Sequence, residues 1–244
     1  MLFDSLTVRF QSAGMIPPPY AHFYTLTARP TGQRLAVNFS ITYTDREELD
    51  EEDITGEGFT LSDDFAWAGE LGTAWVSVLD GLVKQTKLEP FDENALGEED
   101  DFIEVTVSHH NGQPRPGTPA DPEAFLYPIQ ELIQAIYEAG GKEKPFELIY
   151  LRYQRTGDLE LRLTASFAER SLRLSRRENQ RDQPKTLPWT ALQSIMGVVY
   201  AHDYHPDDSL PRPPKRDGHY LNLGGDEWYD ITTLTDVQQA LERL

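Results

Sequence analysis

Two stretches of the chain alternate between apolar and polar residues, and this pattern constrains the fold more than any other feature. Residues 22–43 predict a strand, a tight turn at Pro30-Thr31-Gly32 and a returning strand, and residues 146–167 predict the same around Arg155-Thr156-Gly157. In the first returning strand every second residue is apolar: Leu35, Val37, Phe39, Ile41 and Tyr43. A period of two places such residues on one face of a sheet. We therefore expect two antiparallel hairpins, each with one buried face.

The similarity of the two hairpins predicts an internal duplication. Each is followed by a charged connector, an amphipathic helix, a further strand region and a last helix. Blocks of antiparallel strands alternating with helices are typical of the α+β class. We expect two similar units, residues 1–142 and 143–244, as antiparallel sheets covered by helices, or one compact pseudo-duplicated domain. Two unrelated hairpins with Thr-Gly turns would give the same pattern.

Helical spacing of apolar residues predicts four helices, and residues 2–10 predict a leading strand. The first helix is expected to be capped at Ser62–Asp64 and to run to Leu82, and the second to begin at Pro128 after a Gly/Pro-rich loop over residues 112–119. The third is expected to start at Pro188 and the last at Thr233 or Thr235. Short strands are predicted at residues 220–223 and 228–231.

Charge is distributed unevenly along the chain. The net charge is −19, of which residues 1–142 hold 8 basic and 25 acidic side chains, against 14 and 16 in residues 143–244. Excess negative charge repels phosphate groups, which argues against nucleic-acid and anionic-membrane partners and favours a basic protein surface. The chain has no cysteine, which excludes disulfides, thiolate metal sites and cysteine nucleophiles.

No apolar run approaches the ~20 residues of a membrane helix, and the first residues lack the pattern of a secretory signal. We therefore expect a cytoplasmic protein, and no cofactor is predicted.

The two connectors carry opposite charges. The first, Asp45–Asp64, holds ten acidic residues and one arginine, whereas the second, Glu169–Thr186, is rich in arginine. Charge runs usually form solvated loops; alternatively these two contact one another or bind partners of opposite sign. The residues of the first connector that we expect to contact a partner are Glu47, Glu48, Asp50, Glu51, Glu52 and Asp53.

A cluster of histidine and aspartate forms a candidate metal site between residues 202 and 208. Imidazole and carboxylate groups bind zinc, manganese and iron. The candidate ligands are His202, Asp203, His205, Asp207 and Asp208. The His202-Asp203 pair is similar to the metal-binding pair of HD-type phosphohydrolases, although no matching upstream histidine or downstream aspartate stands out. A solvated helix end is the alternative.

The segment Gly224-Gly225-Asp226-Glu227-Trp228 resembles the GGDEF signature of diguanylate cyclases. Those enzymes carry the signature in a hairpin turn, and the resemblance would imply that this chain cyclises nucleotides. Trp228 stands where that signature has phenylalanine, and too few residues follow it to complete such a domain. Gly-Gly-Asp-Glu is also common turn chemistry.

The sequence thus favours a non-enzymatic protein-binding or adaptor protein that uses an acidic surface, with an inhibitor- or immunity-like role compatible with its charge. The alternative is a metal-dependent hydrolase in which His202 and His205 hold the ion and a bound water attacks the substrate. A structural subunit that binds a second copy of itself is a third possibility.

Overall fold

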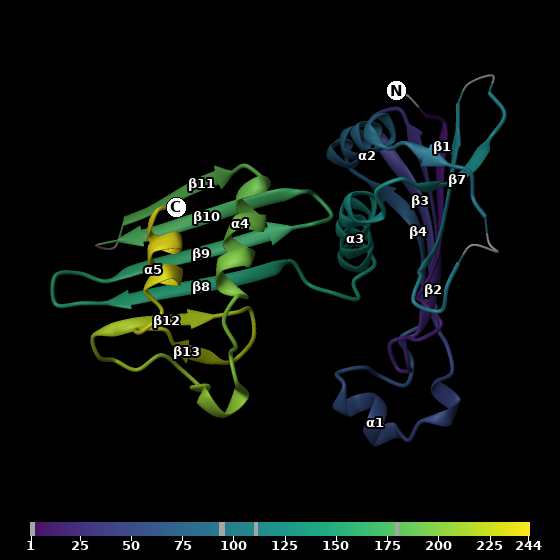
Figure 1. The fold of residues 1–244 in the computed structure, drawn as a ribbon. Helices are drawn as coiled ribbons and strands as arrows, with labels where there is room; N and C mark the ends of the chain where they lie inside the picture. The colour runs from purple at the N-terminus through teal and green to yellow at the C-terminus, as the bar shows by residue number, and fades with distance from the viewer. Residues whose placement is uncertain (1–2, 93–95, 110–111, 179–180) are drawn as a thin grey trace. The chain divides into compact units, whose positions relative to one another are not determined.

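The computed structural model describes residues 3–92, 96–109, 112–178 and 181–244, and the chain divides into two compact units (Figure 1). Unit 1 comprises Met1–Gly140 and unit 2 comprises Gly141–Leu244. Each unit combines an antiparallel sheet with helices, so the predicted α+β class is confirmed. Among the described residues, no helix has the length and apolar character needed to cross a membrane.

Unit 1 contains a sheet whose strands lie in the order β4-β3-β2-β1-β6-β7-β5. The strands are β1 (Ser5–Gln11), β2 (His22–Thr31), β3 (Arg34–Tyr43), β4 (Phe65–Leu71), β5 (Leu88–Glu89), β6 (Phe102–Ser108) and β7 (Arg115–Pro119). Its helices are the short 3-10 helix η1 (Arg46–Glu48), α1 (Glu51–Gly56), α2 (Thr73–Gln85) and α3 (Pro122–Ala139). Residue 2 of the predicted leading strand lies outside the described residues.

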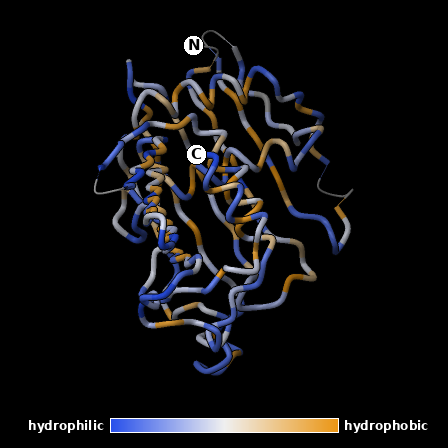
Figure 2. The backbone as a smooth tube through the Cα atoms, turned by 90° about the vertical axis from the view of Figure 1, so that its left-hand side faces the viewer, coloured by the Kyte–Doolittle hydropathy of each residue, from blue (hydrophilic) through white to orange (hydrophobic). Residues whose placement is uncertain are grey.

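Apolar alternation along β1, β2, β3 and β6 creates the buried face of this sheet. Leu6, Leu26 and Leu35 are completely buried, and the residues on either side of each of them along its strand face outward. Figure 2 shows hydrophobic and hydrophilic residues interspersed along the backbone. Helices α2 and α3 cover the apolar face, and each contributes fully buried side chains, such as Trp75 and Ile129. The opposite face carries mainly polar side chains, many of them threonine or serine.

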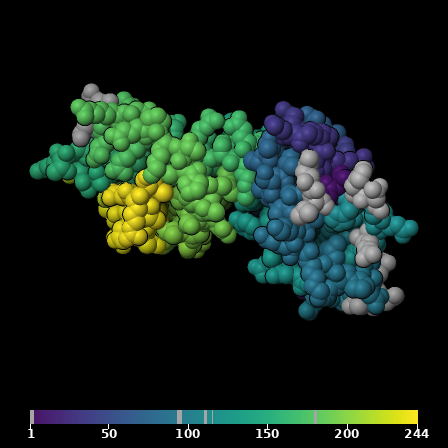
Figure 3. Space-filling view, turned by 90° about the horizontal axis from the view of Figure 1, so that it is seen from above, coloured from purple at the N-terminus to yellow at the C-terminus, as the bar shows by residue number. Residues whose placement is uncertain are grey.

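Unit 2 contains a sheet in the order β11-β10-β9-β8-β12-β13. The strands are β8 (Phe146–Tyr153), β9 (Leu159–Ser166), β10 (Ser171–Glu178), β11 (Arg181–Leu187), β12 (Gly218–Asn222) and β13 (Trp228–Asp230). The helices are α4 (Thr190–Val199), the short 3-10 helix η3 (Pro206–Asp208) and α5 (Thr235–Glu242). Leucines of β8, β9 and β10 form one cluster with apolar residues of α4 and α5. Helix α5, drawn in yellow, remains on the surface of this unit (Figure 3).

The two units share part of their strand order. In both, an antiparallel run of three strands, β2-β3-β4 or β8-β9-β10, precedes a helix, a further strand pair and a last helix. The orders also differ, because β1 lies between β2 and β6, whereas β8 pairs directly with β12, and β11 has no counterpart in unit 1. The internal duplication therefore stays a prediction.

The predicted helix from Ser62 to Leu82 is wrong over its first part. Residues 65–71 form strand β4, which pairs with β3, and α2 begins only at Thr73. Gly69 leaves room for the ring of Trp67 in this strand, because a Cβ atom there would clash with that ring in its present position. The spacing of Phe65, Ala68 and Leu71 fits a helix as well as a strand. Pairing with β3 stabilises the strand and so decides between these two structures.

Three other predictions also need correction. The arginine-rich connector is the hairpin β10-β11 and not a loop, although its residues 179–180 lie outside the described part. Helix α3 begins at Pro122, with Asp121 as its N-cap, and continues through Pro128. The Gly/Pro-rich stretch contains strand β7, which pairs with β6.

Candidate functional site

The acidic connector of unit 1 folds into a defined structure beyond the ends of β3 and β4 (Figure 1). It contains η1 and α1, and the side chain of Ile54 from α1 is buried. Because α1 is shorter than two turns, its own backbone hydrogen bonds contribute little stability. Contacts to the rest of unit 1 must therefore hold the segment in place.

Arg46 makes contacts to the rest of unit 1 and also within the connector. Its guanidinium group donates hydrogen bonds to the carbonyl of Pro19 (3.1 and 2.9 Å) and to that of Thr60 (3.1 Å). It also forms an ion pair with Asp63 (2.8 Å) and lies over the rings of Tyr43 (4.0 Å) and Phe59 (4.7 Å). The side chains of Arg46 and Asp63 are only 12% and 14% exposed. The one positive charge of the connector is thus used inside the fold.

Three acidic residues of the connector also serve the fold. Asp63 accepts hydrogen bonds from the backbone N–H and the hydroxyl of Thr60, and Asp64 accepts one from the N–H of Tyr43. Burial acts to raise the pKa of Asp63, but the hydrogen bonds from Arg46 and Thr60 outweigh it and hold this pKa below its usual value. Glu57 accepts a hydrogen bond from the hydroxyl of Tyr20.

The six acidic residues predicted to contact a partner have a different environment. All six are exposed, and among the described residues none of their carboxylates forms a salt bridge or a hydrogen bond. We call this set the acidic face; it consists of Glu47, Glu48, Asp50, Glu51, Glu52 and Asp53. The structure presents these residues on η1, on α1 and between them, so that a local excess of negative charge is fixed on an ordered scaffold.

Exposed apolar side chains lie at the same end of unit 1. The loop between β1 and β2 packs against the connector, since the N–H of Thr44 donates to the carbonyl of Ala21 and Arg46 binds Pro19. This loop presents Tyr20, which is 44% exposed and packs edge-on against Phe59. Leu61 of the connector is 61% exposed. The acidic face therefore adjoins apolar surface.

The two histidines of the predicted metal site have different hydrogen-bond partners. His202 follows α4 and binds Asp236 of α5 (Nε2 to Oδ2, 2.8 Å), while His205 accepts a hydrogen bond from the N–H of Asp207 (3.4 Å). Asp203 and Asp208 are exposed. In the described parts of the chain, no three histidine, aspartate or glutamate side chains are grouped so as to hold a metal ion. The hydrogen bond from His202 lowers the pKa of Asp236.

The segment that resembles the GGDEF signature lies in the turn between β12 and β13. The side chain of Asn222, a buried polar group, donates to the carbonyls of Gly225 and Glu227 and accepts from the N–H of Gly224. These bonds satisfy the amide within its own turn. The segment therefore has a structural explanation as a hairpin connection.

A polar cluster in unit 2 was not predicted from the sequence. The hydroxyl of Tyr150 donates to Glu242 (2.8 Å) and lies 2.7 Å from Nδ1 of His219, and Arg152 forms an ion pair with Glu242 (3.0 Å). These residues come from β8, β12 and α5. Burial raises the pKa of Tyr150 and lowers that of His219, so both groups are neutral near pH 7. The cluster fixes the end of α5 on the sheet.

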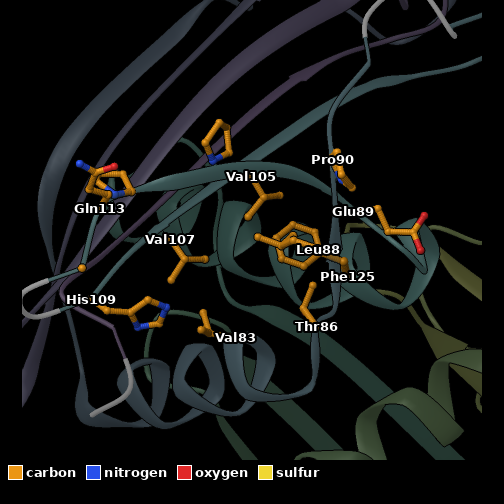
Figure 4. Close-up of a pocket in the computed structure, with 13 residues that line it drawn as sticks. Val83, Thr86, Leu88, Glu89, Pro90, Val105, Val107, His109, Gln113 and Phe125 are labelled. Atoms are coloured by element: carbon orange, nitrogen blue, oxygen red, sulfur yellow. The ribbon is translucent and has the colours of Figure 1, made fainter.

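Unit 1 also contains a pocket of about 790 Å³ between α2, α3 and the strands β5, β6 and β7 (Figure 4). Its middle is apolar, with Val105, Val107, Leu88 and Phe125 around it, while His109 and Gln113 lie toward one end and Glu89 toward the other. No local pattern in the sequence indicates this pocket, because its walls come from five separate elements.

No family model matches this sequence, and no curated protein and no solved structure matches it significantly.

Proposed function

We propose that this chain is a non-enzymatic protein-binding or adaptor protein and that its acidic face engages a basic surface of another protein. The observation that carries the proposal is that the side chain of Arg46 binds groups inside unit 1 and thereby orders the connector. The six carboxylates of the acidic face therefore have no cation as a partner among the described residues. A cytoplasmic location is part of the same proposal.

Charge of this kind acts mainly on the rate and selectivity of association. Complementary charges accelerate encounter and reject partners of the wrong sign, and salt screens the effect over about 8 Å at physiological ionic strength. Exposed carboxylates alone contribute little affinity. The adjoining Tyr20 and Leu61 provide apolar area that a partner can bury, and aromatic residues are enriched among those that dominate binding energy. We therefore expect a basic partner that also carries an apolar contact residue.

Selection from a library of displayed random peptides tests this proposal while the natural partner is still unidentified. We expect peptides that bind the whole protein at low salt to be enriched in lysine and arginine together with an aromatic or aliphatic residue. Their binding should weaken as salt rises. It should be largely lost when the acidic face is neutralised by changing its glutamates to glutamine and its aspartates to asparagine.

A charge-matched variant serves as the control. It neutralises six exposed acidic residues elsewhere, and thereby makes the same change in net charge: Glu123, Asp158, Asp203, Asp208, Asp217 and Asp226. The control should keep most of the binding. Selected peptides with no excess of basic residues, or equal loss of binding in both variants, would remove the proposal.

A further inference from the structure

The pocket between α2, α3, β5, β6 and β7 has walls that are fixed within the fold. Strand β5 packs closely on β7 at Gly117, where a Cβ atom would lie 2.6 Å from the carbonyl oxygen of Glu89. The N–H of Ala120 donates to the carbonyl of Lys87 (2.9 Å), and the hydroxyl of Thr118 donates to that of Ile103 (3.2 Å). These bonds fix the backbone on two sides of the pocket before any ligand arrives.

The walls limit what the pocket can hold. Val105, Val107 and Phe125 are buried residues that face it, and three prolines, Pro90, Pro114 and Pro116, complete its lining. The hydroxyl of Thr86 donates to the carbonyl of Leu82 within α2 (2.8 Å), so it is already satisfied. Polar side chains are placed toward the two ends, as Figure 4 shows for His109, Gln113 and Glu89. An occupant therefore needs an apolar middle.

The volume of the pocket and the charge around it further limit the kinds of ligand that it can bind. A volume of about 790 Å³ lies within the range of about 300–1,000 Å³ that small-molecule sites occupy. The first 142 residues carry 25 acidic and 8 basic side chains, and Glu89 lies at one end of the pocket. Negative potential of this magnitude opposes an anionic ligand. The side-chain amide of Gln113 can hydrogen-bond to a polar group of the ligand.

We propose that this pocket binds a small molecule that carries no negative charge and has an aromatic or branched aliphatic body and one hydrogen-bonding end. The body contacts Val105, Val107 and Phe125, and the polar end lies toward His109 and Gln113. This site is separate from the acidic face, and its occupancy does not depend on the function proposed for that face.

Two fluorescent probes that differ in one group test the proposal. N-phenyl-1-naphthylamine is uncharged, and 8-anilinonaphthalene-1-sulfonate has the same ring system with an added sulfonate. We expect the uncharged probe to bind the full chain with increased fluorescence, and the anionic probe to bind about tenfold more weakly at low salt. Equal affinity for the two probes would overturn the assigned ligand class, and no binding of the uncharged probe would overturn the site.

Matched substitutions locate the binding. Val83→Phe on α2 and Val107→Phe on β6 each place a ring in the pocket and should weaken binding of the uncharged probe about tenfold. Val83 is only half-buried, so this variant should fold even if Val107→Phe does not. Thr25→Phe, an exposed position on β2 that does not line the pocket, should bind as the native chain does. Unchanged binding in Val83→Phe, or equal loss in Thr25→Phe, would show that the probe binds elsewhere.

Discussion

The acidic connector of unit 1 and the arginine-rich segment of unit 2 occupy equivalent places in the sequence pattern, but their structures differ. The acidic connector leaves the sheet and forms η1 and α1, held by Arg46. The arginine-rich segment stays in the sheet as β10 and β11, and its side chains meet carboxylates nearby, as in the pairs Arg173–Glu169 (3.1 Å) and Arg176–Glu178 (3.6 Å).

The comparison teaches that the number of charges does not decide what a charged segment can do. In unit 2 the side chains of Arg162, Arg173 and Arg176 each form an ion pair with a neighbouring glutamate. In unit 1 the one arginine of the connector binds inward, and six carboxylates stay exposed without a cation in the described part of the chain. We therefore expect the two regions to respond very differently to substitution.

The largest effect should follow the substitution Arg46→Met. The carbonyls of Pro19 and Thr60 and the carboxylate of Asp63 would lose their donor together, which we expect to destabilise the connector by about 3 kcal/mol. Hydrogen exchange measured by mass spectrometry should show faster exchange over residues 45–64. Arg173→Met is the matched control in unit 2; its pair with Glu169 is 69% and 64% exposed, so the change should be below about 0.5 kcal/mol. Equal effects would break the comparison.

A smaller effect is expected from Tyr150→Phe in unit 2. This change removes the hydrogen bond to Glu242 and leaves the buried end of the network without its donor, at a cost of about 1–2 kcal/mol. Calorimetry should show a lower melting temperature for unit 2. Tyr200→Phe, at a half-exposed position on α4's C-terminal end, should change stability little. Similar results for both variants would show that the network is not what secures α5.

The pH dependence of unit 2 should follow from His219. Burial lowers its folded pKa below the ordinary value of 6.5, and Arg152 acts in the same direction, whereas Glu242 and Asp230 oppose the shift. The unfolded chain therefore binds the proton first, so stability falls as pH drops below about 6.5 and levels off below the folded pKa. In His219→Gln, melting temperature measured from pH 7 to pH 5 should fall less. An identical fall in both proteins would exclude this origin.

The smallest effect concerns the exposed pair His202–Asp236. Its hydrogen bond lowers the folded pKa of Asp236, so the pair contributes stability above the ordinary pKa of 3.8 and loses it as pH falls through the folded value. NMR titration of the Asp236 carboxyl group should show a pKa below 3.8 that rises in His202→Gln. No rise would mean that the backbone N–H groups at the start of α5 set this pKa by themselves.

The local sequence pattern correctly predicted those elements whose apolar residues follow only one periodicity, that of a strand or that of a helix. The returning strands β3 and β9 alternate between buried apolar residues and more exposed ones, and the strands at Tyr220 and Trp228 also lie where the sequence predicts them. Prediction failed where two patterns coexist. In β10, Leu172 and Leu174 alternate with Arg173, as in a strand. The many charged residues nearby favoured the prediction of a solvated loop instead.

What the sequence determined by itself is therefore the α+β class and the faces of its clearest strands, because side-chain direction in a strand is a local property. Tertiary structure alone decided which polar groups meet. Tyr150, His219 and Glu242 are distant in sequence, and only the pairing of β8 with β12 and the docking of α5 bring them together. Tertiary structure also decided the partner of Arg46 in the connector, since the carbonyl of Pro19 to which it donates belongs to a different loop.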